Sequence, residues 1–224
     1  MTPSELSGTA RDLYQTGSWP LRAMQRWRPY ICPFEQLLPL IPRGSSVLDV
    51  GCGGGLLLFL VTAHDPSARG TGIDVSASSI GFAQQTLLAH SADLQSRLSF
   101  LHMDATKPWP VDMFDVVSLV DVLHHVPSAK QFDVLREAHS HVKPGGLLLY
   151  KDMCDAPWTM AAANRAHDLL LTQQWIRYLA IETVDQWAKD ARLDLIDGRQ
   201  IRRYWYGHEL RLFRRRSAPT DDVH

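Results

Sequence analysis

A glycine-rich loop and an aspartate stand close together early in the chain, in the stretch SSVLDVGCGGGLLLFLV of residues 45–61. Glycine lets a ligand approach the backbone closely, because no Cβ blocks it, and the start of the following helix favours negative charge. A carboxylate or a phosphate would therefore suit this loop. The side chain of Asp49, just ahead of the loop, would repel a pyrophosphate but suits a ligand that also carries an ammonium group.

Three further aspartates, Asp74, Asp104 and Asp121, each stand at or just past the end of a predicted strand. The carboxyl ends of parallel strands meet on one rim of the sheet, where ligands of open α/β folds bind. On that rim Asp74 could accept hydrogen bonds from a ribose diol, and Asp104 could accept from an adenine amino group. Singly, each aspartate is more often a cap or turn residue, but the set of four indicates a nucleoside-containing ligand.

Two common nucleotide-binding motifs do not match this loop. The dinucleotide fingerprint G-x-G-x-x-G requires glycine at position 56, where the chain has Leu56. A Walker-type phosphate loop requires Lys followed by Ser or Thr after the glycines, and neither follows here. These differences disfavour a nicotinamide oxidoreductase, which stays an alternative.

The elements that must position these residues alternate between strand and helix from residue 46 onward. Apolar, β-rich runs predict strands at 46–50, 71–75, 97–103, 114–120 and 147–153, with helices between them. One helix is expected over 128–142, with Phe132, Leu135, Ala138 and Val142 on its inner face. Residues 193–216 predict two strands joined near Gly207, forming an antiparallel hairpin at the sheet edge. The order implies an α/β fold with a doubly wound, mostly parallel sheet.

Five motifs resemble, in order and spacing, those of the class I S-adenosylmethionine-dependent methyltransferases: VLDVGCGGG, GIDVS, MDAT, FDVVSLVDVLHHV and VKPGGLLLYKD. They look most like small-molecule enzymes with an LHH element after the fourth strand. The resemblance covers residues 33–152 and implies a Rossmann-like, seven-stranded, mostly parallel sheet with an antiparallel C-terminal edge hairpin. It implies S-adenosylmethionine as cofactor, with S-adenosylhomocysteine as product. The expected acceptor is a small aromatic or metabolite-like molecule, methylated at oxygen or carbon.

The resemblance also assigns residues to parts of the cofactor. Asp49, Gly51 and Gly53 would line its methionine portion, and Cys52 between them would pack there rather than act as a nucleophile. Asp74 would bind the ribose hydroxyls, and Val75 would pack on the adenine. Asp104 and Ala105 would contact the adenine edge. Val120 and Asp121 would lie near the ammonium group and the sulfonium.

The protein need not activate the methyl donor, because a sulfonium is already a strong one. The main tasks are to align the acceptor and to exclude water. A phenol, enol or amine acceptor additionally needs a general base, and histidine titrates near neutral pH. His124 and His125 are the catalytic candidates, and the alternative for both is a packing role. Lys151 and Asp152, at the end of the fifth strand, are expected to face the same site or else to form a surface ion pair or cap.

Composition favours a cytoplasmic protein without a metal site. The net charge of −1, from 23 basic and 24 acidic side chains, gives no global electrostatic reason to bind nucleic acid. The three cysteines include no CxxC pair, and the histidines lack partners at ligand spacing, so no metal is expected. The N-terminus shows no secretory signal, and the apolar run 56–63 is too short to span a bilayer, so no membrane partner is expected.

Residues 1–44 are expected to form an N-terminal helical arm or lid, and 45–224 the methyltransferase domain, in one domain overall. Trp19 and Trp27 of the arm are expected to pack in the core or as a lid. The C-terminal stretch RRYWYGHELRLFRRR is locally basic and could bind RNA or an acidic carrier protein, or be a plain edge hairpin. A small-molecule methyltransferase is the leading interpretation. The alternatives are an RNA or protein methyltransferase, a nicotinamide-dependent oxidoreductase and a non-catalytic cofactor-binding module.

Overall fold

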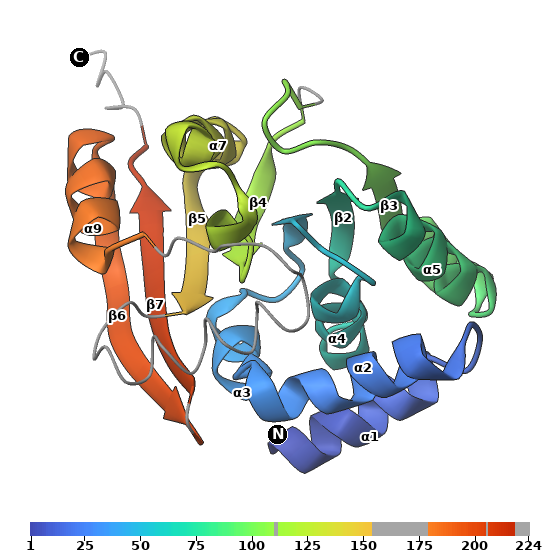
Figure 1. Cartoon of the computed structure of the whole chain (residues 1–224). Coiled ribbons are helices and arrows are strands. Elements are labelled where there is room, and N and C mark those ends of the chain that lie inside the picture. The colour runs from blue at the N-terminus through green and yellow to red at the C-terminus, as the bar shows by residue number, and fades with distance from the viewer. Residues whose placement is uncertain (110–111, 154–178, 205, 218–224) are drawn as a thin grey trace.

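The computed structural model describes residues 1–109, 112–153, 179–204 and 206–217. These residues form a seven-stranded sheet with the strand order β3-β2-β1-β4-β5-β7-β6 and helices on both faces (Figure 1). The strands are β1 (Ser46–Val50), β2 (Arg69–Asp74), β3 (Leu98–His102), β4 (Phe114–Val120), β5 (Val142–Met153), β6 (Leu193–Arg203) and β7 (Tyr206–Arg215). The predicted Rossmann-like α/β sheet is confirmed.

Strand pairing is parallel through the first five strands and antiparallel at the C-terminal edge. β1 pairs with β2 and β4, β2 with β3, and β4 with β5, all in parallel. β7 pairs antiparallel with both β5 and β6, which confirms the hairpin. Its turn comes earlier than predicted, because β6 ends at Arg203 and β7 begins at Tyr206, so that Gly207 lies inside β7. The chain order reverses between β1 and β4, the point at which such sheets bind ligands.

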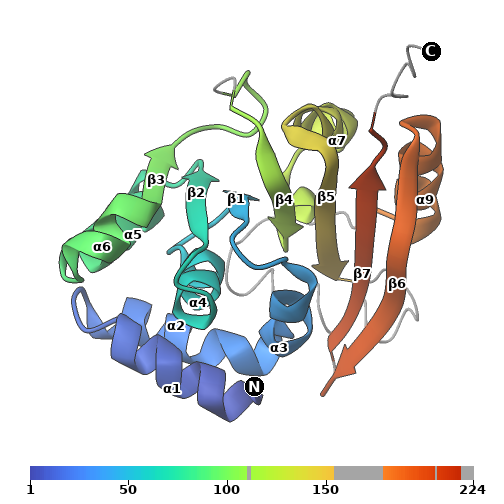
Figure 2. The same ribbon diagram turned by 180° about the vertical axis from the view of Figure 1, so that it is seen from behind.

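Two hydrophobic cores lie on the two faces of the sheet, as alternation along the strands requires. Val47 belongs to the core shared with α4, α5 and the N-terminal helices, whereas the next residue, Leu48, belongs to the core shared with α7 and α9 (Figures 1 and 2). The helices are α1 (Pro3–Leu13), α2 (Trp19–Ile31), α3 (Phe34–Leu37), α4 (Leu56–His64), α5 (Ala77–Leu88), α6 (Ala92–Arg97), α7 (Gln131–Ser140) and α9 (Ile181–Asp190). Short 3₁₀ turns are η1 (Leu38–Leu40), η2 (Leu123–His125) and η3 (Ser128–Lys130).

The N-terminal helices cover α4, which the sequence makes apolar on nearly all sides. A helix of composition LLLFLVTAH needs cover on its outer face as well as against the sheet. Leu6, Ala10 and Tyr14 supply part of this cover from α1 and the residue after it. The Tyr14 ring packs with its centroid 5.5 Å from that of Phe59, and the Tyr14 hydroxyl donates to the carbonyl oxygen of Gly54 at 2.7 Å. The arm is therefore joined to the glycine loop.

The two tryptophans of α2 are more exposed than predicted. Gln25 and Pro29 form the buried side of this helix. Trp19 and Trp27 are 75% and 60% exposed, so the expectation that they pack in the core is wrong, while their role in a lid stays a prediction. In both views α1 and α2 lie at the end of the molecule toward which the β5 arrow points (Figures 1 and 2). The arm thus occupies the carboxyl end of the sheet.

The helix expected over 128–142 is shorter than predicted. Residues 128–130 form the 3₁₀ turn η3, α7 ends at Ser140, and Val142 already begins β5. The buried face of α7 is formed by Gln131, Val134, Leu135 and Ala138, while Phe132 is exposed. The predicted inner face was wrong at its ends because one continuous helical period was extended across a turn and into a strand.

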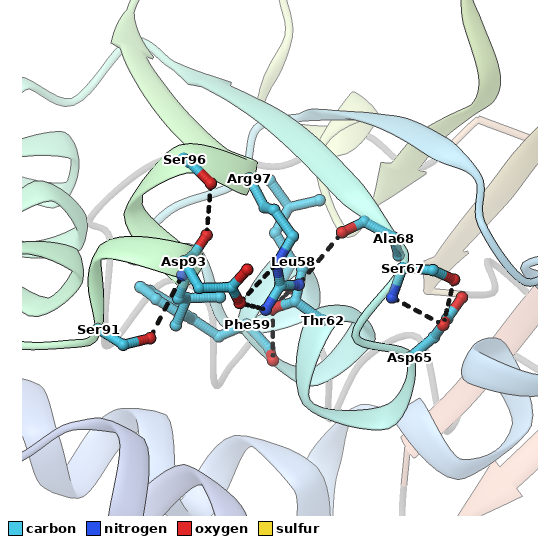
Figure 3. A network of polar contacts seen from close by, with 11 residues as sticks. Leu58, Phe59, Thr62, Asp65, Ser67, Ala68, Ser91, Asp93, Ser96 and Arg97 are labelled. Atoms are coloured by element: carbon cyan, nitrogen blue, oxygen red, sulfur yellow. Dashed lines mark hydrogen bonds and ion pairs between the residues drawn. The ribbon is translucent and has the colours of Figure 1, made fainter.

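A polar network supports the opposite, amino-terminal side of the sheet (Figure 3). Arg97 at the end of α6 pairs with Asp93 at 2.9 Å and donates to the carbonyl oxygen of Ala68 at 3.2 Å. Asp65 accepts hydrogen bonds from the hydroxyl and the backbone N–H of Ser67 at 2.6 and 3.1 Å. These contacts fix the connection from α4 to β2, away from the rim that carries the four aspartates.

The sequence pattern also predicts helices over 158–180 and 183–191. Of the first segment the structure describes only residues 179 and 180. The second corresponds to α9.

Candidate functional site

The strand ends bring the predicted polar residues to one rim. Because β2, β1, β4 and β5 are parallel neighbours, their carboxyl ends share one edge of the sheet. Asp49 lies near the end of β1, Asp74 ends β2, Asp121 directly follows β4, and Asp152 lies near the end of β5. Asp104 stands two residues past β3, the outer strand on that side.

The glycine loop has positive φ angles and close contacts that leave no room for a side chain at its glycines. Gly51 has a φ of 72°, and a Cβ there would lie 2.3 Å from Cγ2 of Val122. The backbone N–H groups of Gly51 and Cys52 both donate to the Ile73 carbonyl oxygen, at 2.8 and 3.0 Å. Gly53, at φ 54°, donates its N–H to Asp74 Oδ2 at 2.7 Å. The loop is thus held against the end of β2, with its backbone uncovered by side chains of its own.

Asp49 is almost fully buried and accepts a hydrogen bond from the Ser118 hydroxyl at 2.8 Å. Burial raises its pKa to about 7, while Ser118 and the guanidinium of Arg28 act in the opposite direction. A buried carboxylate of this kind is stabilised by a cationic partner. The environment of Asp49 therefore fits a ligand with an ammonium group.

Cys52 packs behind the loop rather than in it. Its sulfur lies 2.7 Å from where a Cβ of Gly72 would be, so the thiol fills the space that this glycine leaves. Burial, followed by the charges of Asp49 and Asp74, raises the pKa of the Cys52 thiol well above its usual value. The thiol stays protonated, which agrees with a packing role and not with a nucleophile.

Asp74 and Asp104 both stand in turns that their own carboxylates organise. Asp74 Oδ1 accepts from the Ser76 N–H at 2.8 Å, beside the Gly53 contact of its other oxygen. Asp104 Oδ1 accepts from the N–H and the hydroxyl of Thr106, both at 2.8 Å, and these bonds lower its pKa. Val75, between β2 and α5, is 66% exposed. Each carboxylate keeps further lone pairs, and Val75 offers an open apolar surface next to them.

Three arm residues that the sequence analysis did not single out reach the glycine loop. Arg28 Nη1 lies 3.7 Å from the Cβ position of Gly53, and Gln25 Nε2 lies 2.7 Å from that of Gly54. Gln25 is 1% exposed, and neither atom of its amide has a hydrogen-bond partner within the described ranges. Together with Tyr14, which anchors the arm, they form a wall opposite the loop. No motif marks them; the only signal is that Gln25 and Arg28 are three residues apart on one helix.

Asp121 and Lys151 form a buried ion pair at the ends of β4 and β5. Asp121 has a φ of 56°, unusual for a residue with a side chain. Its backbone N–H donates to the Lys151 carbonyl oxygen at 2.8 Å, and its carboxylate accepts from Lys151 Nζ at 2.5 Å. Burial opposes its ionisation, but the charge of Lys151 and those of nearby groups hold the pKa of Asp121 well below its usual range. Lys151 is fully buried, so the expectation of a surface ion pair is wrong.

His124 and Asp152 form a second buried pair on the same rim. Asp152 Oδ1 is hydrogen-bonded to His124 Nδ1, with the two side chains only 2% and 4% exposed. The Met153 N–H donates to the same aspartate oxygen at 2.8 Å, and Gln131 Nε2 donates to the carbonyl oxygen of Leu123 in η2. His125 differs, because it is exposed, with its ring centroid 4.1 Å from that of His124. The geometry separates the two histidines that the sequence treats alike.

The arginines of the C-terminal stretch are largely bound within the fold. The partners of four of them are Glu35 and the Pro29 carbonyl for Arg203, Asp185 for Arg211, the Val142 carbonyl for Arg215, and Asp194 for Arg216. These four side chains thus form ion pairs and hydrogen bonds that connect β6 and β7 to neighbouring elements. This arrangement supports the edge-hairpin interpretation over a binding surface for RNA.

Neither a metal-binding cluster nor a membrane-spanning helix is found among the described residues. No group of three or more His, Cys, Asp or Glu side chains in this part of the chain is arranged to hold a metal ion. Within the same ranges, no helix is both long enough and apolar enough to cross a bilayer.

The sequence of the chain is similar to those of known proteins. Residues 48–148 match the family described as a methyltransferase domain. A ubiquinone biosynthesis O-methyltransferase from Albidiferax ferrireducens is 29% identical over 215 residues, which cover 90% of this chain and 78% of that protein. One from Coxiella burnetii is 30% identical over 172 residues, covering 73% of this chain and 68% of that protein. The chain belongs to the S-adenosylmethionine-dependent methyltransferases.

The methyltransferase fold is also evident from solved structures. An O-methyltransferase family protein from Burkholderia thailandensis superposes with a TM-score of 0.71 at 24% identity, over 88% of this chain and 58% of that one. Membership of the family confirms that this methyltransferase uses S-adenosylmethionine and methylates a small molecule. This membership rules out the two alternatives of a nicotinamide-dependent oxidoreductase and a non-catalytic cofactor-binding module.

Proposed function

We propose that this methyltransferase transfers a methyl group to a hydroxyl oxygen of a small aromatic acceptor, with His124 as general base. The observation that carries the proposal is the buried hydrogen bond between His124 Nδ1 and Asp152 at the rim. With Nδ1 engaged, a proton from an acceptor would pass to Nε2. The names of the relatives from Albidiferax ferrireducens and Coxiella burnetii, both O-methyltransferases, support oxygen over carbon.

The residues of the rim fit the methionine end of the cofactor. S-adenosylmethionine supplies an activated methyl group on its sulfonium when bound. Asp49, Gly51 and Gly53 would line its amino-acid portion with Cys52 packed behind them, because the loop leaves the backbone open and Asp49 favours an ammonium group. Arg28 would bind the carboxylate, since a guanidinium matches a carboxylate in two hydrogen bonds.

Gln25 strengthens the case for a ligand between the arm and the loop. Its buried amide has no partner among the residues described, and an unsatisfied buried amide costs about 1–3 kcal/mol. A carboxylate or an ammonium group bound beside Arg28 would satisfy it. In this proposal the arm, residues 1–44, acts as the lid of the cofactor site.

The adenosine end would lie along β2 and β3. Asp74 would accept the ribose hydroxyls, Val75 would pack on the adenine, and Asp104 with Ala105 would meet the adenine edge. The exposure of Val75 and the remaining lone pairs of the two carboxylates support these roles.

Val120 and Asp121 complete the proposed cofactor site, near the ammonium group and the sulfonium. Asp121 stays ionised in the structure because Lys151 pairs with it, so it presents a negative charge beside a cationic cofactor. An acidic carrier protein and a cytoplasmic location stay predictions outside this proposal.

Substituting Asp74→Ala should weaken binding of S-adenosylhomocysteine by about 100-fold, through the loss of two hydrogen bonds of about 1.5 kcal/mol each. The fold should persist with a loss of about 1–2 kcal/mol in the free energy of unfolding, since the N–H groups of Gly53 and Ser76 lose their acceptor. Calorimetric titration and urea unfolding measure the two effects. An unfolded variant, or a folded one with unchanged affinity, would remove Asp74 from the site.

Cofactor affinity should rise with pH up to about pH 7. In the free protein burial holds the pKa of Asp49 at about 7, so this carboxyl is protonated in more acidic buffer. A bound ammonium group would favour the carboxylate, so that binding releases a proton, and affinity increases up to about tenfold per pH unit before levelling off. Titrations with S-adenosylhomocysteine between about pH 5.5 and pH 8 test this, with Asp49→Asn as the control that should lose the dependence. An affinity independent of pH in the wild-type protein would contradict an ammonium group at Asp49.

The proposed reaction is tested by incubation with S-adenosylmethionine and a set of phenols, enols and amines. We expect a product one methyl group heavier whose new methyl signal in the NMR spectrum is that of a methoxy group. Transfer to nitrogen or carbon acceptors, with none to oxygen, would contradict the proposal.

A further inference from the structure

Arg203, the last residue of β6, reaches from the edge hairpin to the arm. Its guanidinium forms an ion pair with Glu35 of α3, 168 residues earlier in the chain, and donates to the Pro29 carbonyl oxygen of α2 at 3.2 Å. The two charged side chains are only 14% and 15% exposed. In both views the end of β6 lies beside α3 (Figures 1 and 2). The proposed reaction does not explain this contact.

The contact stabilises the last turn of α2, which is weak by itself. The last four carbonyl groups of a helix lack donors within the helix, and the carbonyl of Pro29 is one of them. Pro29 also has no N–H, so it removes one hydrogen bond from the turn before it. Arg203 supplies a donor from another element, and its positive charge suits the carboxyl end of the helix dipole. It thus acts as a cap for α2.

This turn carries Arg28, the residue proposed to bind the carboxylate of the cofactor. Arg28 directly precedes Pro29, and its own carbonyl oxygen accepts from the Cys32 N–H at 2.8 Å. A guanidinium matches a carboxylate in two parallel hydrogen bonds only when it is held in a suitable orientation. Because Arg28 reaches the glycine loop from the end of a helix, its placement depends on the contacts that fix this end.

The hairpin contacts the same end of the arm at a second point. His208 of β7 is fully buried, and its ring interacts with the backbone of Ile31, the last residue of α2. Another part of the arm is fixed separately, by the hydrogen bond from the Tyr14 hydroxyl to the Gly54 carbonyl oxygen. The arm is therefore attached to the glycine loop at one place and to the hairpin at another, with Arg28 next to the hairpin attachment.

We propose that Arg203 is a positioning residue of the cofactor site, which holds Arg28 against the glycine loop. It does so through its bonds to the Pro29 carbonyl and to Glu35, and without touching the cofactor. The inference rests on the proposed binding of the cofactor carboxylate by Arg28. It deepens that proposal, because it gives the C-terminal hairpin a part in cofactor binding.

Replacing Arg203 with Gln should weaken binding of S-adenosylhomocysteine by about 5- to 10-fold, the effect expected from a partial loss of charge-assisted hydrogen bonds. The affinity for methylthioadenosine should change by less than about twofold. Methylthioadenosine has no amino-acid carboxylate, so a displaced Arg28 affects only the first ligand. Calorimetric titration of the full chain with both ligands measures the two affinities. In steady-state kinetics the variant should raise KM for S-adenosylmethionine and leave kcat unchanged.

Two further variants make the comparison specific. Arg202→Gln is the matched control, because this neighbouring arginine of β6 is exposed, and it should leave both affinities unchanged. Arg203→Lys should bind S-adenosylhomocysteine with an affinity between those of the wild-type protein and Arg203→Gln. An ammonium group keeps the charge beside Glu35, but it lacks the fork of donors that also reaches the Pro29 carbonyl.

A double variant tests whether Arg203 acts through Arg28. Adding Arg203→Gln to Arg28→Met should weaken binding of S-adenosylhomocysteine by less than about twofold further, because the group that Arg203 positions is then absent. The full loss repeated in the double variant would overturn the inference. So would an equal loss of affinity for methylthioadenosine in Arg203→Gln, since the residue would then support the arm in general.

The outcomes separate this inference from the proposed function. If Arg28→Met weakens binding of S-adenosylhomocysteine and Arg203→Gln does not, the role of Arg203 alone is overturned. Wild-type protein that does not bind S-adenosylhomocysteine overturns the cofactor site and this inference with it. Should Arg203→Gln fail to fold, Glu35→Gln takes its place. The same difference between the two ligands is then expected, and an equal loss or no loss overturns the inference.

Discussion

Replacing His124 with Asn should lower kcat by about 10²- to 10⁴-fold while binding of S-adenosylhomocysteine stays unchanged. The size follows from the usual contribution of a positioned general base. The affinity should be preserved because His124 pairs with Asp152 and is not among the residues assigned to bind the cofactor. Steady-state kinetics with the best phenolic acceptor, together with calorimetry on the same preparation, measure both quantities.

The control for this prediction is His125→Asn, next along the chain but exposed. It should change kcat by less than about threefold, since surface substitutions seldom have large effects. The kcat of Asp152→Asn should lie between those of His124→Asn and His125→Asn, because an amide holds the imidazole in place less well and cannot stabilise its protonated form. Equal losses in His124→Asn and His125→Asn would instead indicate that the LHH element is a packing element.

Replacing Arg28 with Met should weaken binding of S-adenosylhomocysteine by about 10- to 100-fold. The change removes a charge-assisted pair of hydrogen bonds, worth about 1.5–3 kcal/mol, and leaves a side chain of similar length against the loop. Arg28→Lys should recover only part of the affinity, because an ammonium group cannot match a carboxylate in two parallel bonds. Calorimetric titration of the three proteins measures the series.

Methylthioadenosine provides the sharper control for Arg28, because it has the adenosine and the sulfur but no amino-acid carboxylate. Its affinity should be the same in the wild-type protein and in Arg28→Met. Arg26→Met, an exposed arginine of the same helix, should leave both ligands unaffected. If Arg28→Met weakened both ligands equally, the residue would support the arm and not bind the carboxylate.

The strands could be predicted because their signal is local. The runs at 46–50 and 114–120 are apolar and bounded by turn residues, and β1 and β4 have those bounds. The errors fall where a local pattern continues past a change of element. Val142 has the spacing of a helix residue but pairs with Phe114 as the first residue of β5. The hairpin turn was displaced to Gly207 because glycine usually marks turns, whereas here Tyr204 has the positive φ.

The site could be predicted only where a residue belongs to a strand end or to a motif. The positions of Asp49, Asp74 and Asp121 follow from the parallel topology, because each lies at or next to the end of a strand on the same rim. Gln25 and Arg28 do not, since they reach the loop from a helix about 25 residues earlier in the chain, and only tertiary packing brings them there. The same holds for the pairing of His124 with Asp152, 28 residues apart.

Titration of the purified protein with S-adenosylhomocysteine, with NADH as control, tests most directly whether the rim and the arm form one cofactor site. We expect one binding event per chain with a micromolar Kd for S-adenosylhomocysteine and no heat with NADH. A cooperatively folded, ligand-free sample that binds neither compound, or that binds NADH alone, would contradict the cofactor site proposed for the rim.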